Sequence, residues 1–288
     1  MKKFIGSALS LAVIFLCACT GAGTPENPSA APAAYSKIIN TAKFVHEYEL
    51  EAPPVTLPPG VKAVIVPHGG ESIGMAAEII AGLAALGPKT VILIAPNHTK
   101  AGPKIAATYA AFSAYHGLVL PHEEKIRTLE GRGLAGVEDA LFEEEHSVGI
   151  LMPLLARYLP GAKAVPLLFQ KGVPFNTAKR AVDTACDLSD PDTVIVASID
   201  FSHGLPSREE RLRRASMLEC ILAYDAAGVL NLDATYVDAP VVLGALLQLM
   251  KDNGCAVELI AQANSTELLG REVPAATGYM TFVFYGGG

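Results

Sequence analysis

The sequence predicts an α/β fold, namely a single domain with a mainly parallel central sheet that is covered by helices on both faces. Several short runs are almost entirely apolar, as at residues 90–95 (TVILIA) and 193–198 (TVIVAS). Such runs are typical of strands buried on both faces, because a solvated face would require polar residues at alternate positions. Segments of helical composition separate the runs, which is the pattern of a βαβ chain. Since 51% of the 288 residues are hydrophobic, intrinsic disorder is excluded.

The predicted elements alternate along the chain from residue 61 onward. The first strand is followed by a helix that ends at Gly87 and Pro88. A strand and loop excursion is expected at residues 104–121. Strands are predicted at residues 61–66, 90–95, 164–169, 193–198, 256–262 and 278–285. Helices are predicted at residues 72–86, 123–131, 138–159, 174–188, 207–227 and 239–252.

The first twenty residues have the pattern of an export signal. Lys2 and Lys3 precede an apolar stretch at residues 8–16, which is too short to span a bilayer as a mature helix. The stretch ends in Leu-Cys-Ala-Cys, which resembles the lipobox of bacterial lipoproteins. This resemblance predicts that residues 1–18 are a lipoprotein signal peptide and that Cys19 carries lipid. The protein would then be lipid-anchored at the cell envelope, on the extracytoplasmic side; an ordinary secretory signal is the alternative.

Three regions are therefore predicted. Residues 1–18 are the signal peptide, and residues 61–288 are the α/β domain. Between them, residues 19–60 contain the lipidated cysteine, a tether rich in Pro and Ala, and an irregular or edge segment that leads into the domain.

Charge, cysteine usage and missing motifs exclude several classes of protein. The 22 Lys and Arg residues against 29 Asp and Glu residues give a net charge of −7, so no basic footprint for nucleic acid is present. The three cysteines of the predicted mature domain are an odd number without CxxC spacing, which argues against a disulfide framework and a zinc knuckle. The sequence has no GxSxG, GxxxxGK[ST] or HExxH motif, so the commonest hydrolases, NTPases and zinc peptidases lack support.

Three of the seven histidines follow predicted strands at equivalent positions. His68, His98 and His203 each lie a few residues beyond the end of an apolar run, and Asp200 accompanies the last of them. Ligands of open α/β sheets bind beyond the carboxyl ends of the strands. We therefore expect these side chains to share one hollow. His146, which follows the acidic residues 143–145, is a fourth candidate because the intervening helix could return it to the same rim.

Clustered imidazoles are suited either to metal binding or to proton transfer near neutral pH. Asp200 could orient His203 as a general base or support it as a metal ligand. The alternative for any one of these histidines is a structural turn whose imidazole is hydrogen-bonded. For His146, the alternative is a surface ion pair with the neighbouring glutamates.

Five motifs in order resemble the MEMO family, also called AmmeMemoRadiSam system protein B, which is related to the LigB-like class III extradiol dioxygenases. The motifs are PHGG at residues 67–70, PNHT at 96–99, EEEHSVG at 143–149, SIDFSH at 198–203 and ANSTE at 263–267. The corresponding family patterns are PHAGY, GP(N/S)H, EHSIE, SSDFxH and a late turn that in animal members carries a cysteine. The resemblance extends over about residues 61–285.

The resemblance implies a metal held by His68 and His98, with His146, His203 and Asp200 as catalytic groups at the same pocket. Ferrous iron is the expected ion, and copper is the alternative. The family's Tyr in PHAGY and Glu in EHSIE are absent here. Where animal members have a metal-binding cysteine, this chain has Thr266 followed by Glu267. Glu267 is therefore the expected third ligand, with Thr266 or water as alternatives.

The family resemblance leads us to expect a mononuclear metal-binding protein with redox or dioxygenase-like activity on a small molecule, and the lipobox-like N-terminus leads us to expect that it is membrane-anchored. A non-catalytic module that binds a metal or a small ligand at the cell envelope is the alternative, and the sequence leaves open whether the protein is an enzyme. A hydrolase with a metal-activated water is the least favoured hypothesis, because no second metal cluster is evident.

Overall fold

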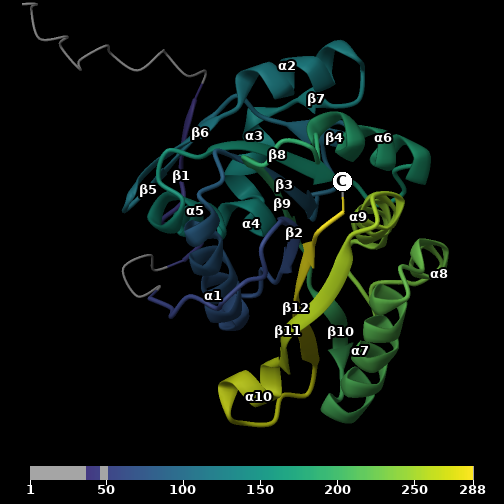
Figure 1. The fold of residues 1–288 in the computed structure, drawn as a ribbon. Coiled ribbons are helices and arrows are strands. Elements are labelled where there is room, and N and C mark those ends of the chain that lie inside the picture. The colour runs from purple at the N-terminus through teal and green to yellow at the C-terminus, as the bar shows by residue number, and fades with distance from the viewer. Residues whose placement is uncertain (1–36, 46–50, 288) are drawn as a thin grey trace, which may run out of the picture. The chain divides into compact units, whose positions relative to one another are not determined.

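The computed structural model describes residues 37–45 and 51–287, which belong to one compact unit that spans residues 35–288 (Figure 1). The predicted signal peptide, Cys19 and the tether lie outside the described residues, so their assignment stays a prediction. Within the described part of the chain, no helix combines the length and the apolar character that a membrane span needs.

A single large sheet forms the centre of the molecule, and its middle is parallel. The strands β2 (Val61–Val66), β9 (Thr193–Ser198), β3 (Thr90–Pro96) and β8 (Lys163–Phe169) lie side by side in parallel pairs. This confirms the predicted α/β class with a mainly parallel central sheet. Along the sheet, the order of strands is β1-β5-β6-β8-β3-β9-β2-β12-β10, with β11 beside β12 and β4 linking β7 to β8.

The outer strands are shorter or antiparallel. On one side of the sheet, β6 is followed by β5 and β1, so that part of the predicted lead-in segment becomes an edge strand. On the other side, β12 pairs antiparallel with β2, β10 and β11. These strands are β1 (Ile38–Asn40), β4 (Ile105–Ala107), β5 (Ala111–Ala114), β6 (Gly117–Pro121), β7 (Gly136–Val137), β10 (Phe201–Leu205), β11 (Ala256–Asn264) and β12 (Ala276–Tyr285).

Both faces of the sheet are covered because successive residues of its central strands enter two different cores. In β2, Ala63 and Ile65 belong to one core, whereas Val64 and Val66 belong to the other. The first core includes helices α6 (Phe175–Ala185) and α9 (Pro240–Asp252), and the second includes α1 (Ile73–Leu83) and α5 (Met152–Tyr158). The remaining α-helices of the described residues are α2 (Glu123–Gly131), α3 (Asp139–Glu144), α4 (His146–Gly149), α7 (Ser207–Leu222), α8 (Ala226–Leu230) and α10 (Ser265–Leu269), and short 3-10 helices lie at Gly70–Ser72 and Ala84–Leu86.

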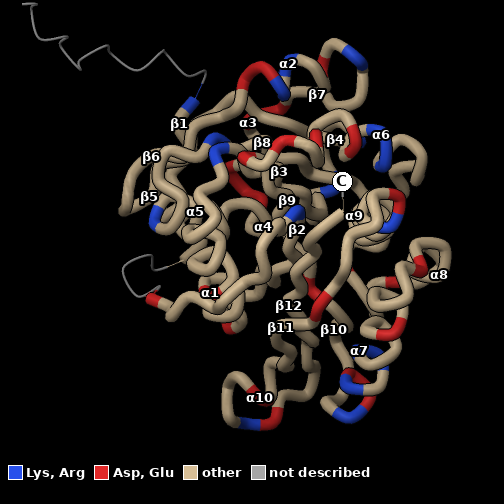
Figure 2. Tube along the Cα trace, in the orientation of Figure 1, with Lys and Arg blue, Asp and Glu red and all other residues tan. Residues whose placement is uncertain are grey.

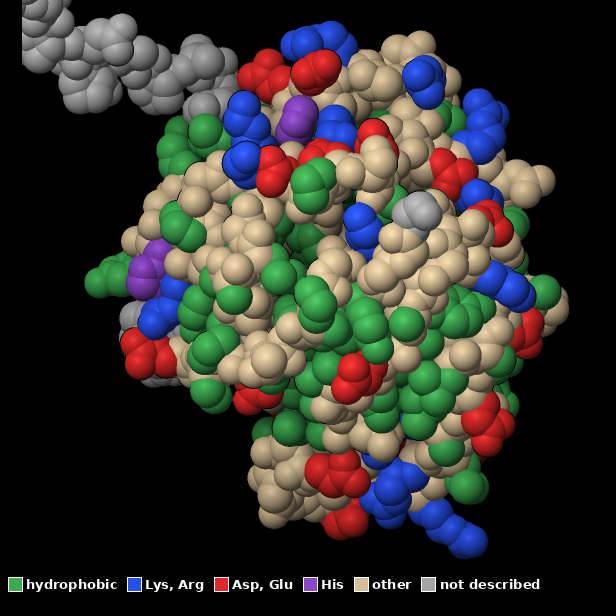
Figure 3. All heavy atoms as spheres, viewed as in Figure 1, with side chains coloured by type: hydrophobic (Ala, Val, Ile, Leu, Met, Phe, Trp, Pro, Cys, Tyr) green, Lys and Arg blue, Asp and Glu red, His purple; other side chains and the backbone are tan. Residues whose placement is uncertain are grey.

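Charged residues lie mainly on the helices and connecting segments, as expected for strands buried on both faces (Figure 2). On the face shown in Figure 3, side chains of both signs lie interspersed around green hydrophobic areas.

The helix predicted at residues 138–159 is wrong as a single element, because the chain forms α3, α4 and α5 there. The first break is at Glu145, whose backbone is extended with φ −87° and ψ 109°. The side chain of Glu145 accepts hydrogen bonds from His98 and Ser147. These tertiary contacts outweigh the local helical preference of the segment, which the sequence pattern alone reflects.

Two of the short elements that the sequence prediction missed are β10 and α10. The segment after β9, for which the sequence predicted no element, forms β10 and pairs with β12 at Phe201 and Leu205. The helix α10 begins directly after β11, and Asn264 is its N-cap. Both lie at the ends of long strands, where the pairing partner and the cap determine the backbone conformation.

Candidate metal centre

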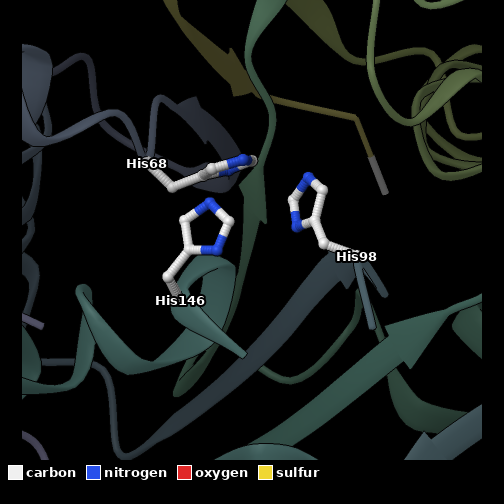
Figure 4. A group of neighbouring side chains, drawn as sticks. All are labelled: His68, His98 and His146. Atoms are coloured by element: carbon white, nitrogen blue, oxygen red, sulfur yellow. The ribbon is translucent and has the colours of Figure 1, made fainter. Parts of the chain in front are cut away.

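Three imidazoles from separate elements meet at the carboxyl edge of the sheet (Figure 4). The ring centroid of His68 lies 5.4 Å from that of His98 and 5.3 Å from that of His146, and the last two rings are 4.6 Å apart. One ring nitrogen of each histidine lies within 4.8 Å of the corresponding nitrogens of the other two. This separation is short enough for one metal ion to contact all three rings.

The sheet topology explains why the first two histidines converge. His68 follows β2 and His98 follows β3, and both strands pair in parallel with β9. The carboxyl ends of parallel strands meet at one edge of the sheet, where ligand sites of α/β proteins form. The structure therefore brings together His68 and His98 as predicted.

His146 reaches the same edge because the chain breaks before it. The extended Glu145 ends α3, and His146 is the first residue of α4. The Oγ of Ser147 donates a hydrogen bond to the carbonyl oxygen of Pro96 over 2.9 Å, which joins α4 to the end of β3. Burial, together with the neighbouring His68 and His98, lowers the pKa of His146 and favours the neutral ring that a metal requires.

Glu145 holds His98 in place. Its fully buried carboxylate accepts hydrogen bonds from the backbone N–H of His98 over 2.6 Å, from Nδ1 of His98 over 2.8 Å and from the N–H of Ser147 over 3.1 Å. Burial acts to raise the pKa of Glu145, but these hydrogen bonds outweigh it and hold the pKa at about 2. With Nδ1 occupied in this way, His98 presents Nε2 as its metal-binding nitrogen.

The tautomer of His68 follows from a chain of hydrogen bonds. The Oγ of Ser198 donates to the carbonyl oxygen of Ser147 over 2.6 Å, so its single proton is already used. The same Oγ lies 2.9 Å from Nδ1 of His68 and must act as the acceptor there. Nδ1 of His68 is therefore protonated, and Nε2 is the nitrogen available to a ligand.

Asp238 lies opposite that nitrogen, and sequence reasoning missed it. Its Oδ2 is 3.1 Å from Nε2 of His68 and 3.9 Å from Nε2 of His98, and its side chain is only 8% exposed. The other oxygen, Oδ1, is buried and has no hydrogen-bond partner among the described residues. Asp238 follows no strand of the central sheet, so the strand-end argument could not find it. The only signal was an acidic residue shortly before the helix that begins at Pro240.

The facing atoms of His68 and Asp238 require a cation between them or a proton. A nitrogen lone pair and a carboxylate oxygen 3.1 Å apart repel each other unless one of these is present. Without a metal, His68 is protonated. Burial lowers the pKa of His68, but the carboxylates of Asp200 and Asp238 outweigh this effect and raise the pKa to about 9. The three imidazole nitrogens, which lie within 4.8 Å of one another, are also a ligand set that suits a divalent transition metal. The residues present therefore fit a metal ion.

Asp200 and His203 have different surroundings from those expected. The buried Oδ1 of Asp200 accepts the backbone N–H of His68 over 2.9 Å, so Asp200 supports the turn that carries His68. Burial raises the pKa of Asp200 above its ordinary value. His203 lies half-buried on β10, outside the group of three imidazoles, and its Nδ1 is buried without a hydrogen-bond partner in the described part of the chain. The catalytic roles of Asp200 and His203 stay predictions.

The structure does not bring Glu267 to the three imidazoles. Its Oε2 accepts the backbone N–H of Asn264 over 2.9 Å, and its own N–H donates to Oδ1 of Asn264, which completes a capping box at the start of α10. The Oγ1 of Thr266 lies 2.7 Å from Oγ of Ser207. An Asn followed three residues later by Glu is itself a capping-box pattern, so the sequence contained the signal for this structural role.

Comparisons with known proteins find relatives over most of the chain. The profile of a family described as Memo-like protein matches residues 27–282. A MEMO1 family protein of Caldivirga maquilingensis is 27% identical over 267 residues, which cover 86% of this chain and 93% of the relative. Another from Methanopyrus kandleri is 29% identical over 245 residues, or 80% and 84% of the two chains. A solved structure of an uncharacterised Escherichia coli protein aligns with 78% of this chain and all of its own, with a TM-score of 0.47 and 12% identity.

Proposed function

Because the chain belongs to the Memo family, we propose that it binds one divalent metal ion through His68, His98 and His146, with Asp238 as a carboxylate ligand. The observation that carries this proposal is the approach of Oδ2 of Asp238 to Nε2 of both His68 and His98, at 3.1 and 3.9 Å. The proposal assigns to Asp238 the ligand position that the sequence had suggested for Glu267, and it assigns His146 to the metal rather than to proton transfer.

The chain's own residues would orient this ligand set. Glu145 fixes His98, and the hydroxyl of Ser198 fixes His68, so that each ring presents Nε2. Partners of this kind on the outer nitrogen raise the basicity of a metal-bound imidazole. Three imidazoles and one carboxylate leave further coordination positions open on an octahedral ion.

The proposed activity is redox or dioxygenase-like chemistry on a small molecule. A bound ferrous or copper ion would supply the electron transfer that this chemistry needs. His203, whose Nδ1 has no hydrogen-bond partner among the described residues, would hold or accept a proton near the bound substrate. Asp200 would act through His68, whose backbone it holds.

Metal analysis of protein purified without oxygen tests the proposal. The wild type should contain about one equivalent of iron or copper, and the double variant His68→Ala/His98→Ala should contain none. Asp238→Ala should weaken the affinity for the metal at least tenfold. His116→Ala removes an exposed imidazole that is hydrogen-bonded to Arg157, and it should leave the affinity for the metal unchanged. Wild-type protein with no more metal than the double variant would overturn the proposal.

A non-catalytic module that holds a metal or small ligand is the second candidate. It is favoured by Gly149, which replaces the family's glutamate after the third histidine. Dioxygen consumption by the metal-loaded protein with a panel of catechols separates the two candidates. Turnover supports the enzyme, and metal binding without turnover supports the module.

The proposal also places the protein at the cell envelope, anchored by lipid on Cys19. Lys2 and Lys3, the short apolar stretch and the lipobox-like sequence support it. Cells fed labelled palmitate should label the wild type and not the variant Cys19→Ala. Equal labelling of the two proteins, or labelling of neither, would reject lipidation at this position.

A further inference from the structure

A cavity of about 180 Å³ lies beside the imidazole group, and His98 and Asp238 line it. The rest of its wall is mostly apolar, with Phe169 from the end of β8, Val242 from the first turn of α9 and the half-buried Leu232. Phe169 and Val242 are almost completely buried. An apolar space next to a few polar groups is the usual form of a small-molecule site.

Two lysines stand at the solvent-exposed rim of this cavity. Lys100 and Lys171 both line it and are both exposed. Neither forms an ion pair or a side-chain hydrogen bond with any residue in the described ranges. The two acids of the same wall form no direct ion pair with either lysine: Oδ1 of Asp233 accepts hydrogen bonds from the backbone and hydroxyl of Thr235, and Asp238 faces His68. The hydrogen bonds from Thr235, with a smaller contribution from the charge of Lys171, lower the pKa of Asp233. The rim therefore offers two lysine ammonium groups that no direct ion pair or hydrogen bond within the described ranges engages.

The loops that carry these lysines are fixed to each other. The Nε2 of Gln170, which precedes Lys171, donates hydrogen bonds to the carbonyl oxygens of Ala101 over 2.8 Å and of Gly102 over 2.9 Å. The side chain of Asn97 accepts the backbone N–H of Lys100, whose φ of 59° lies in the left-handed region that most residues avoid. The spacing of the two lysine backbones is thus set by the fold before any ligand arrives.

We propose that this cavity binds a small carboxylate with an apolar body of about one ring. The carboxylate would lie at Lys100 and Lys171, and the apolar body would pack against Phe169, Leu232 and Val242. The size follows from the volume, since an apolar cavity of about 150 Å³ in another protein accepts benzene. The inference rests on the proposed function in one respect, namely that it makes this ligand the substrate of the adjoining metal site.

Binding measurements with a matched pair of probes test the proposal. Benzoate and its uncharged isostere benzamide are titrated into the purified full-length protein by ligand-observed NMR, and the metal content of each sample is measured in parallel. Benzoate should bind about tenfold more tightly than benzamide, because two exposed lysine contacts supply a modest charge-dependent gain each. Acetate, which lacks the apolar body, should bind much more weakly than benzoate.

Three variants assign the effect to the rim and the wall. Lys100→Met/Lys171→Met should reduce the affinity for benzoate to that for benzamide. Lys104 is an exposed lysine outside the cavity wall, so Lys104→Met should leave the affinities for both probes unchanged. Leu232→Trp should fill the cavity and abolish binding of both probes while metal content stays unchanged. Equal affinities of benzoate and benzamide for the wild type, or an equal loss in Lys104→Met, would overturn the inference. Such a result with metal still bound would leave the proposed metal site intact, whereas loss of metal from the wild type would reject that site instead.

Discussion

Replacing Glu145 by Gln should destabilise the protein and weaken its metal site together. Oε1 of Glu145 accepts from Nδ1 of His98 and from the N–H of Ser147, and Oε2 accepts the N–H of His98 over 2.6 Å. The glutamine amide has one oxygen and one NH₂ group. The NH₂ group would therefore replace either Oε1 or Oε2 and face an N–H donor instead of accepting from it. The unsatisfied buried N–H costs about 1–3 kcal/mol, and weakening of the two remaining charge-assisted bonds adds about 1 kcal/mol.

The expected loss in the free energy of unfolding is therefore about 2–4 kcal/mol. Urea denaturation of metal-free protein measures it, and competition with a chelator measures the affinity for metal, which should fall about 10- to 100-fold because the outer partner of His98 is disturbed. The neighbouring substitution Glu144→Gln is a matched control. Glu144 is 73% exposed and pairs with Lys43 at the surface, so its loss should stay within about 0.5 kcal/mol. If the two variants unfold at the same urea concentration, the assigned role of Glu145 is refuted.

Three further predictions concern other parts of the molecule. Ser198→Ala should lower metal affinity about tenfold, because Nδ1 of His68 loses the acceptor that fixes its tautomer; unchanged affinity in a chelator titration would contradict this. Gly278→Ala should destabilise the protein by about 1–3 kcal/mol in urea, since an added Cβ would overlap the buried carboxylate of Glu210. Burial raises the pKa of Cys186 to about 12, so iodoacetamide at pH 8 should modify it at least tenfold more slowly in folded than in denatured protein. Because the unfolded thiol ionises near pH 8.5 and the folded one near 12, this group should also reduce stability progressively across that interval as pH rises.

The central sheet was predictable because its strands carry a strong local signal. The strands at residues 61–66 and 193–198 have the predicted bounds, since runs of apolar residues leave no alternative to burial on both faces. His68 and His98 were found for the same reason, because parallel strands place their carboxyl ends at one edge. Local periodicity and the position of strand ends were sufficient for these features.

The remaining parts of the site depend on contacts that no local pattern encodes. Asp238 reaches the imidazoles through a segment that pairs with β10 only by the single bridge between Val237 and Phe201. The break at Glu145 interrupts a segment of helical composition, because the Glu145 side chain binds His98, which lies about 50 residues away in the chain. Glu267 shows the opposite case, because its capping pattern is local and the structure contains the capping box, whereas its predicted role as a metal ligand rested on the family resemblance and on the chemistry of its carboxylate.

The three consecutive residues 145–147 connect to all three imidazoles, and this explains why the helix break lies where it does. Glu145 binds both the backbone and Nδ1 of His98, and His146 is itself the third imidazole. The carbonyl oxygen of Ser147 takes the proton of the Ser198 hydroxyl, and that hydroxyl in turn fixes the tautomer of His68. A continuous helix would use this carbonyl and the backbone N–H of Ser147 internally and would turn the Glu145 side chain away from His98. The broken helix is therefore the element that converts two adjacent strand ends into a site with three oriented nitrogens.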